Sequence, residues 1–297
     1  MKKFVLFVVA ILMTTACSGN DLKKAQALYD AGDYQKAHTL LEGLVNKTPD
    51  DAEARILMGK VFIAAGDFKS AIEQLDVVLD KDRENSDALA YRGLAMWHSG
   101  DHANAFYAVT AALESNPDNA DALLIRAAIK MEMGQNDKAI DDLDRAIELN
   151  GGTDDALLTR SLIYEGMGEY DKALQDLNNV LAKNPENYEA LQRRSILYHK
   201  MEQWDKALTD INSILKMAPD NSEALVTRGR IKLRTGDMEG AIADHNQAIE
   251  IAPDNLEAYV SRGAIYQSTG KTDWAIADYT TIIKKDKEYV DGWFYRA

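Results

Sequence analysis

The chain of 297 residues carries a formal charge of −14, and 46% of its residues are apolar. This much apolar surface excludes a disordered chain, while only five prolines and 18 glycines favour helices around a real core. An acidic excess of this size repels phosphate groups, so we expect no nucleic acid as a partner and no polybasic attraction to anionic lipid.

Residues 1–16 are typical of a secretory signal peptide. Lys2 and Lys3 precede an apolar run from Phe4 to Met13. These ten residues are too few for a helix that crosses a membrane, which takes roughly 20. Because both lysines leave with the signal, the rest of the chain carries 32 basic and 48 acidic side chains, a charge of −16.

Cys17 is the only cysteine of the chain, so it cannot form an internal disulfide. The run Thr-Thr-Ala-Cys that ends at Cys17 resembles the bacterial lipobox, with Thr14 where Leu is usual. In a lipobox, signal peptidase II cuts before the cysteine and the sulfur carries diacylglycerol. The resemblance predicts a lipid anchor on Cys17, a tether over residues 17–21 and, since Ser18 follows instead of Asp, the outer membrane facing the periplasm. The alternative is a stray small residue in a targeting segment.

A period of 34 residues runs without insertion or deletion from residue 18 to residue 289. It gives eight repeats, at 18–51, 52–85, 86–119, 120–153, 154–187, 188–221, 222–255 and 256–289. The turn glycines in register are Gly32, Gly66, Gly100, Gly134, Gly168, Gly236 and Gly270, with Glu202 in the one gap. Residues 290–297 begin a further helix with no following helix to cover it. We expect Trp293 to pack on the eighth repeat, and Phe294 or Tyr295 to be exposed.

Each repeat predicts a pair of helices. Residues 88–99 carry apolar side chains at helical spacing. Gly100 suits the left-handed residue that ends a helix, and Asp101 suits the cap of the next one. The small residues Gly93 and Ala105 let the two helices approach closely. A single hairpin has too little core of its own, so neighbouring hairpins are expected to stack.

The pattern resembles the tetratricopeptide repeat family over the whole repeated region. The family's small residue in the first helix stands at Gly59, Gly93, Gly229 and Gly263, and its aromatic residues at Phe62, Tyr164, Tyr198, Tyr266, Tyr34, Phe68, Tyr170 and Trp204. The family's proline is replaced by Arg83, Gly151 and Lys287, which puts the local loop geometry in doubt. The resemblance implies an all-α fold, a right-handed superhelical solenoid of helix-turn-helix repeats whose inner groove is lined by the first helix of each repeat.

The family's groove positions can be carried over residue by residue. The lining they imply includes Leu94, Trp97, Leu124, Met131, Leu158, Leu162, Gln192, Ile196, His199, Lys200, Arg230 and Arg234. Its first half is apolar with acids at the rim, and its sixth and seventh repeats are basic. We therefore expect a peptide groove with one end that binds acidic groups, with Trp97 as the aromatic anchor. The alternatives are solvated helix faces, and a Trp97 that packs between hairpins.

Charged residues also recur with the repeat. Arginine stands at one position of the first helix, as Arg92, Arg126, Arg160, Arg194, Arg228, Arg262 and Arg296, and aspartate at one position of the second, as Asp142, Asp176, Asp210, Asp244 and Asp278. Such a row could bind an extended ligand. Because both members repeat with the fold, we expect structural ion pairs, between residues 16 apart within a repeat or 18 apart between neighbours.

The sequence contains no catalytic motif that escapes the repeat register. With one cysteine and five histidines we expect no metal, and the turn between His98 and His102 keeps those two off a common face. We expect a non-enzymatic scaffold that binds proteins or peptides, with no cofactor and no small-molecule substrate. By analogy with other repeat lipoproteins it would serve pilus, secretion or cell-wall machinery. The alternative is a structural lipoprotein that self-assembles into a homo-oligomer, which sedimentation of the acyl-free protein would reveal.

Overall fold

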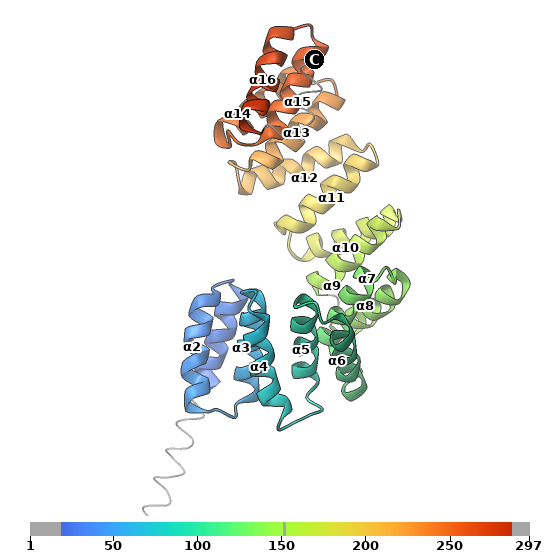
Figure 1. The fold of residues 1–297 in the computed structure, drawn as a ribbon. Coiled ribbons are helices and arrows are strands. Elements are labelled where there is room, and N and C mark those ends of the chain that lie inside the picture. The colour runs from blue at the N-terminus through green and yellow to red at the C-terminus, as the bar shows by residue number, and fades with distance from the viewer. Residues whose placement is uncertain (1–18, 151–152, 287–297) are drawn as a thin grey trace, which may run out of the picture. The chain divides into compact units, whose positions relative to one another are not determined.

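The structure, a computed structural model, describes residues 19–150 and 153–286, and all regular secondary structure in these ranges is helical (Figure 1). The expectations for the signal segment, Cys17 and residues 290–297 lie outside the described residues. The chain divides into two compact units, residues 1–159 and 160–297. The all-α fold of helix-turn-helix repeats predicted from the period is confirmed.

The first unit contains helical residues 19–30, then α2 (Tyr34–Lys47), α3 (Ala52–Ala64), α4 (Phe68–Leu79), α5 (Ser86–His98), α6 (His102–Ser115), α7 (Ala120–Glu132) and α8 (Asn136–Asn150). α9 (Asp154–Gly166) begins in the first unit and ends in the second. The second unit continues with α10 (Tyr170–Lys183), α11 (Tyr188–Lys200), α12 (Trp204–Met217), α13 (Ser222–Arg234), α14 (Met238–Ile251), α15 (Leu256–Ser268) and α16 (Thr272–Lys285). The first helices of successive hairpins, α3 to α15, begin 34 residues apart.

Each hairpin turns on a residue in the left-handed conformation. Gly100, with φ of 92°, ends α5 and its amide donates to the carbonyl of Trp97. Asp101 then caps α6, since its carboxylate accepts from the amide of Asn104 at 3.4 Å. Glu202 adopts the same conformation, with φ of 57°, where the other described turns have glycine. A side chain in this conformation costs about 1 kcal/mol, so Glu202 is tolerated and not preferred.

The two helices of a hairpin approach closely where the first helix carries a small residue. A Cβ atom on Gly93 would lie 2.4 Å from Cγ2 of Val109 and 2.9 Å from the carbonyl oxygen of Ala105. A Cβ atom on Gly263 would lie 2.8 Å from the ring of Tyr279. The expectation that small residues permit this packing is confirmed, and the residue 16 positions later in the second helix fills the space.

The arginine row of the first helices pairs with the aspartate row of the second helices. The pairs join residues 16 apart, with N–O distances of 2.6–2.7 Å, at Arg126–Asp142, Arg160–Asp176, Arg194–Asp210, Arg228–Asp244 and Arg262–Asp278. The structural interpretation with a spacing of 16 is thereby confirmed. All five carboxylates are buried within their hairpins.

Three of these arginines also reach the preceding repeat. Arg194 donates to the side-chain oxygen of Asn178 at 2.7 Å, and Arg228 and Arg262 make the same bond to asparagines 16 residues earlier. Arg92 has Ala108 at the aspartate position of its own hairpin, and it pairs with Asp76 of the preceding one at 2.6 Å. The row therefore joins hairpins to each other as well as the helices within them.

Candidate binding groove

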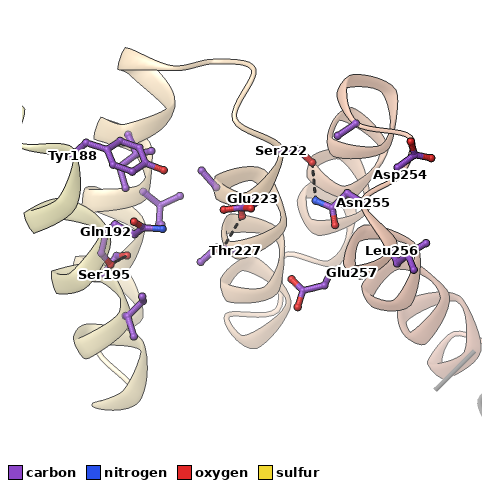
Figure 2. A pocket seen from close by; sticks show the side chains of 15 residues that line it. Tyr188, Gln192, Ser195, Ser222, Glu223, Thr227, Asp254, Asn255, Leu256 and Glu257 are labelled. Atoms are coloured by element: carbon purple, nitrogen blue, oxygen red, sulfur yellow. Dashed lines mark hydrogen bonds between the residues drawn. The ribbon is translucent and has the colours of Figure 1, made fainter. Parts of the chain in front are cut away.

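A large cavity of the second unit lies along the first helices of the last three repeats (Figure 2). Its volume is about 680 Å³, and it is lined by α11 between Tyr188 and Ile196 and by the amino-terminal parts of α13 and α15. Tyr188 and Gln192 border it on α11, Glu223 and Thr227 on α13, and Glu257 on α15 (Figure 2). These helices begin side by side because the repeats stack in register, which brings together residues about 34 positions apart in the sequence.

The walls of this cavity are polar and acidic around an apolar floor. Ile211 and Ile214 of α12 form part of the floor, and both are buried. Three carboxylates, of Glu223, Asp254 and Glu257, line the cavity, and no lysine, arginine or histidine does. The field inside it therefore favours a positive group.

Two of the three carboxylates have a basic partner. Asp254 pairs with Lys285 at 2.6 Å, and Glu257 pairs with Arg230 at 3.1 Å. Glu223 is exposed and forms no salt bridge within residues 19–150 and 153–286. The Glu223 carboxylate is thus the charged group of this cavity that is available to pair with a ligand.

The predicted basic end of the groove lies at the other ends of the same first helices. Lys200 is exposed and pairs with Glu165 at 2.7 Å, while Arg230 also donates to the hydroxyl of Ser261 at 3.3 Å. Arg234 is exposed at the end of α13. None of these three cations borders the cavity. Lys200 and Arg230 each already form a salt bridge with a carboxylate of this chain.

Three further predicted groove residues, His199, Leu162 and Ile196, lie in the second unit. The ring of His199 packs edge-on against Trp204, with centroids 5.1 Å apart. Burial, and then the charges of Arg234 and Arg230, lower the pKa of His199 below its usual value. Leu162 and Ile196 are among the exposed large apolar side chains, at 36% and 41%. Of the predicted residues in the second unit, Gln192 and Ile196 border the large cavity.

In the first unit, the predicted apolar residues contribute more to packing than to an open surface. Leu94, Trp97 and Leu124 are half-buried and pack against one core cluster that includes Val109. Met131 is half-buried, and Leu158 is buried. The structure thus brings Leu94, Trp97 and Leu124 together around a shared core.

Trp97 combines both roles that the sequence left open. Its indole Nε1 donates to a carboxylate oxygen of Glu132 at 2.7 Å, and its ring packs edge-on against His102 at 4.2 Å. It also borders an apolar cavity of about 480 Å³ together with Tyr107 and Met133. Replacing Trp97 would therefore change the core and the surface together, so other residues are better probes of binding.

The groove side of the first unit already holds a cation of its own. Lys60 is largely buried, and its ammonium group lies 3.9 Å from a carboxylate oxygen of Asp121 and 4.6 Å from the centroid of the Tyr91 ring. The Tyr91 hydroxyl donates to Asp121. Burial, followed by the charge of Asp121, raises the pKa of Tyr91, so this phenol stays protonated. Lys60, Tyr91 and Asp121 therefore contact one another, and the charge of Lys60 is compensated within the chain.

Apart from Gln192 and Ile196, the residues around the large cavity were not predicted from the sequence, although a signal for them existed. Acids recur at the second residue of every first helix from the second repeat on, as Glu53, Asp87, Asp121, Asp155, Glu189, Glu223 and Glu257. An acid there also suits the positive end of a helix dipole, so its recurrence does not by itself indicate a binding site. Only the stacking reveals which of these acids borders a cavity.

The described part of the chain lacks two other classes of feature. No group of three or more His, Cys, Asp or Glu side chains in that part could hold a metal ion. Within the same residues, no helix has the length and apolar content needed to cross a membrane.

Comparison with known families agrees with the repeat structure. A family model described as the tetratricopeptide repeat protein 21 N-terminal ARM repeat matches residues 68–208. Two models described as tetratricopeptide repeat match residues 28–94 and 194–260. No curated protein matches the sequence.

Solved structures match the fold at low sequence identity. A chain of the APC/C hetero-tetramer Cut9–Hcn1 is 13% identical with a TM-score of 0.66, over 93% of this chain and 54% of that one, so this chain spans about half of its length. The protein pilF of Pseudomonas aeruginosa is 19% identical with a TM-score of 0.61, over 70% and 94%. YrrB, described as a TPR protein with an unusual peptide-binding site, is 17% identical with a TM-score of 0.55, over 64% and 98%. Residues 28–94 and 194–260 are thus similar to tetratricopeptide repeats, in agreement with the helix pairs at 34-residue spacing.

Proposed function

We propose that this chain is a non-enzymatic scaffold of the bacterial cell envelope that binds client proteins in the grooves formed by its first helices. The observation that carries the proposal is the open cavity of about 680 Å³ between α11, α13 and α15, with an unpaired carboxylate in its wall. Proteins built from tetratricopeptide repeats generally act as interaction scaffolds, and YrrB, which shares the fold, has a peptide-binding site of its own. Clients are expected in pilus, secretion or cell-wall machinery, by analogy with other repeat lipoproteins.

Client binding in the groove is tested best at Ile196. Replacing Ile196 by alanine removes apolar contact area from the cavity wall while leaving the buried core intact, since this side chain is 41% exposed. We expect the amount of crosslinked client recovered from intact cells to fall by about fivefold or more, because a contact at the centre of an interface is worth about 1 kcal/mol or more. The melting temperature should change little.

A matched control exists in the same unit. Ile276 of α16 is 43% exposed and does not border the cavity, so Ile276→Ala removes the same atoms at the same exposure from another surface. Crosslinking of the same clients in the same amounts to the Ile196→Ala variant and to the wild type would contradict a role of this groove.

The envelope location rests on the lipobox-like run that ends at Cys17. Replacing Cys17 by alanine removes the sulfur that would carry the lipid, so we expect the protein either to leave the membrane pellet or to accumulate as an unprocessed precursor. Two acyl chains or more make attachment stable, at about 0.8 kcal/mol for each buried CH2 group. Membrane fractionation and gel mobility measure both effects. A variant that fractionates and migrates like the wild type would refute the lipid anchor.

A further inference from the structure

The two units carry the same groove register with different side chains. Lys60 in the first unit and Ile196 in the second stand at the same position of their repeats, four repeats apart. In the same way Asp121 corresponds to Glu257, and Tyr91 corresponds to Thr227. The acid is thus kept in the second unit, while the lysine is replaced by an uncharged residue and the tyrosine by a smaller one.

In the first unit, the group at this position of the groove is a lysine ammonium. The ammonium of Lys60 lies between the ring of Tyr91 and the carboxylate of Asp121, with 20% of its side chain exposed. A cation in such a place gains from the carboxylate charge and from the aromatic face. The two following repeats, which contribute Tyr91 and Asp121, therefore compensate the largely buried positive charge of Lys60.

In the second unit the corresponding place is the open cavity. Ile196 and Thr227 border it, and Glu223 and Glu257 supply carboxylates without any lysine, arginine or histidine in the wall. Glu223 corresponds in register to Asp87, which borders the groove beside Lys60 in the first unit. Gln192 and Asn255 add side-chain amides to the same wall, and such amides can bond to the backbone of an extended chain.

We propose that the cavity between α11, α13 and α15 binds an extended segment of a client protein through a lysine or arginine side chain, which takes the place that Lys60 takes in the first unit. This inference rests on the proposed function and specifies the chemistry of the client: a basic segment, whereas the sequence analysis expected an acidic one. Glu223 is the principal partner, because Glu257 already pairs with Arg230.

The test measures binding of three fluorescein-labelled peptides to the full-length chain in detergent by fluorescence anisotropy. The peptides share a glycine and serine background of about seven residues, enough to span roughly 23 Å when extended. They carry arginine, the neutral isostere citrulline or glutamate at their centre. The arginine peptide is expected to bind about tenfold more tightly than the citrulline peptide, and to weaken as salt is added.

Two variants with matched controls locate the effect. Glu223→Gln should reduce the affinity for the arginine peptide about tenfold, whereas Glu189→Gln should not, because Glu189 pairs with Arg193 and does not border the cavity. Ile196→Lys supplies the missing cation from within and should abolish binding of this peptide. Ile276→Lys adds the same charge elsewhere in the unit and should leave the affinity unchanged.

Equal affinity for the arginine and citrulline peptides, preference for the glutamate peptide, or equal loss in Glu223→Gln and Glu189→Gln would each overturn the inference. Absence of any arginine-peptide binding would overturn it too. The proposed function is judged separately, by the loss of crosslinked clients in Ile196→Ala. If Ile196→Ala loses its clients but the peptides bind without a charge preference, the proposed function stands and this inference is wrong.

Discussion

Replacing Asp210 by alanine is expected to lower the free energy of unfolding by about 3 to 5 kcal/mol, because it leaves a charged partner without compensation inside the hairpin. The Asp210 side chain is only 2% exposed, and it accepts two bonds from Arg194, at 2.6 and 2.8 Å. Urea denaturation measures the loss, and hydrogen exchange of α11 and α12 places it. A loss below about 1 kcal/mol would contradict a structural role for the row.

A double-mutant cycle separates the pair from its surroundings. Combining Arg194→Met with Asp210→Ala should give a coupling energy of about 2 kcal/mol, because removal of both charges costs less than the sum of the single losses. The pair Arg92–Asp76 is the control, since its side chains are 28% and 47% exposed and lie in different repeats. Its coupling should stay below about 1 kcal/mol. Equal coupling in both pairs would show that burial is not what gives the row its strength.

Replacing His245 by leucine is expected to stabilise the chain by about 1 to 3 kcal/mol at neutral pH, because an imidazole without hydrogen bonds is expensive to bury. His245 is fully buried, and neither ring nitrogen has a hydrogen-bond partner in the described residues. The other described repeats have an aliphatic residue at this position, except for Tyr279 in the last repeat. Leucine stands there four times, as Leu41, Leu75, Leu143 and Leu177, so the repeat accommodates it.

The same substitution should remove a dependence of stability on pH. Burial, followed by the charge of Arg230, lowers the pKa of His245 from 6.5 to about 4, with Asp244 acting in the opposite direction and Arg262 adding to the decrease. Between these pH values the unfolded chain binds more protons than the folded chain. Stability contributed by the neutral ring is therefore complete above pH 6.5 and falls by about 3 kcal/mol as the pH decreases to 4.

The measurement is the difference in unfolding free energy between wild type and His245→Leu at several pH values. The advantage of leucine should grow as the pH decreases from 6.5 to 4, and hydrogen exchange should place it in α13 and α14. His38→Leu is the control, since it removes an imidazole that is only half-buried from the second helix of the first repeat. A stability difference that does not change with pH would mean that the His245 ring is not buried in its neutral form.

Periodicity alone determined the repeats, the starts of the helices and the arginine and aspartate rows. These features follow from local rules, because a glycine in the left-handed conformation ends a helix wherever the turn recurs, and the arginine of a first helix faces the residue 16 positions later in the second helix of the same hairpin. The small residue opposite a bulky one, as at Gly93 and Val109, belongs to the same local geometry. Both partners of such a contact lie in the same repeat, so the contact can be predicted from the sequence of one repeat.

The tertiary structure decided which polar groups are left without a partner, and this determines the candidate site. Lys200 and Arg230 were expected to bind acidic groups of a client, yet they contact Glu165 and Glu257 from neighbouring repeats. Glu223 belongs to a row that the sequence presents as uniform, and only the stacking leaves it unpaired beside a cavity. Pairing between repeats depends on side-chain reach and on the volume of each neighbour, as the exchange of Lys60 for Ile196 illustrates. The 34-residue period does not predict side-chain reach or neighbouring volume, because every acid in the row of Glu223 occupies the same position of its repeat.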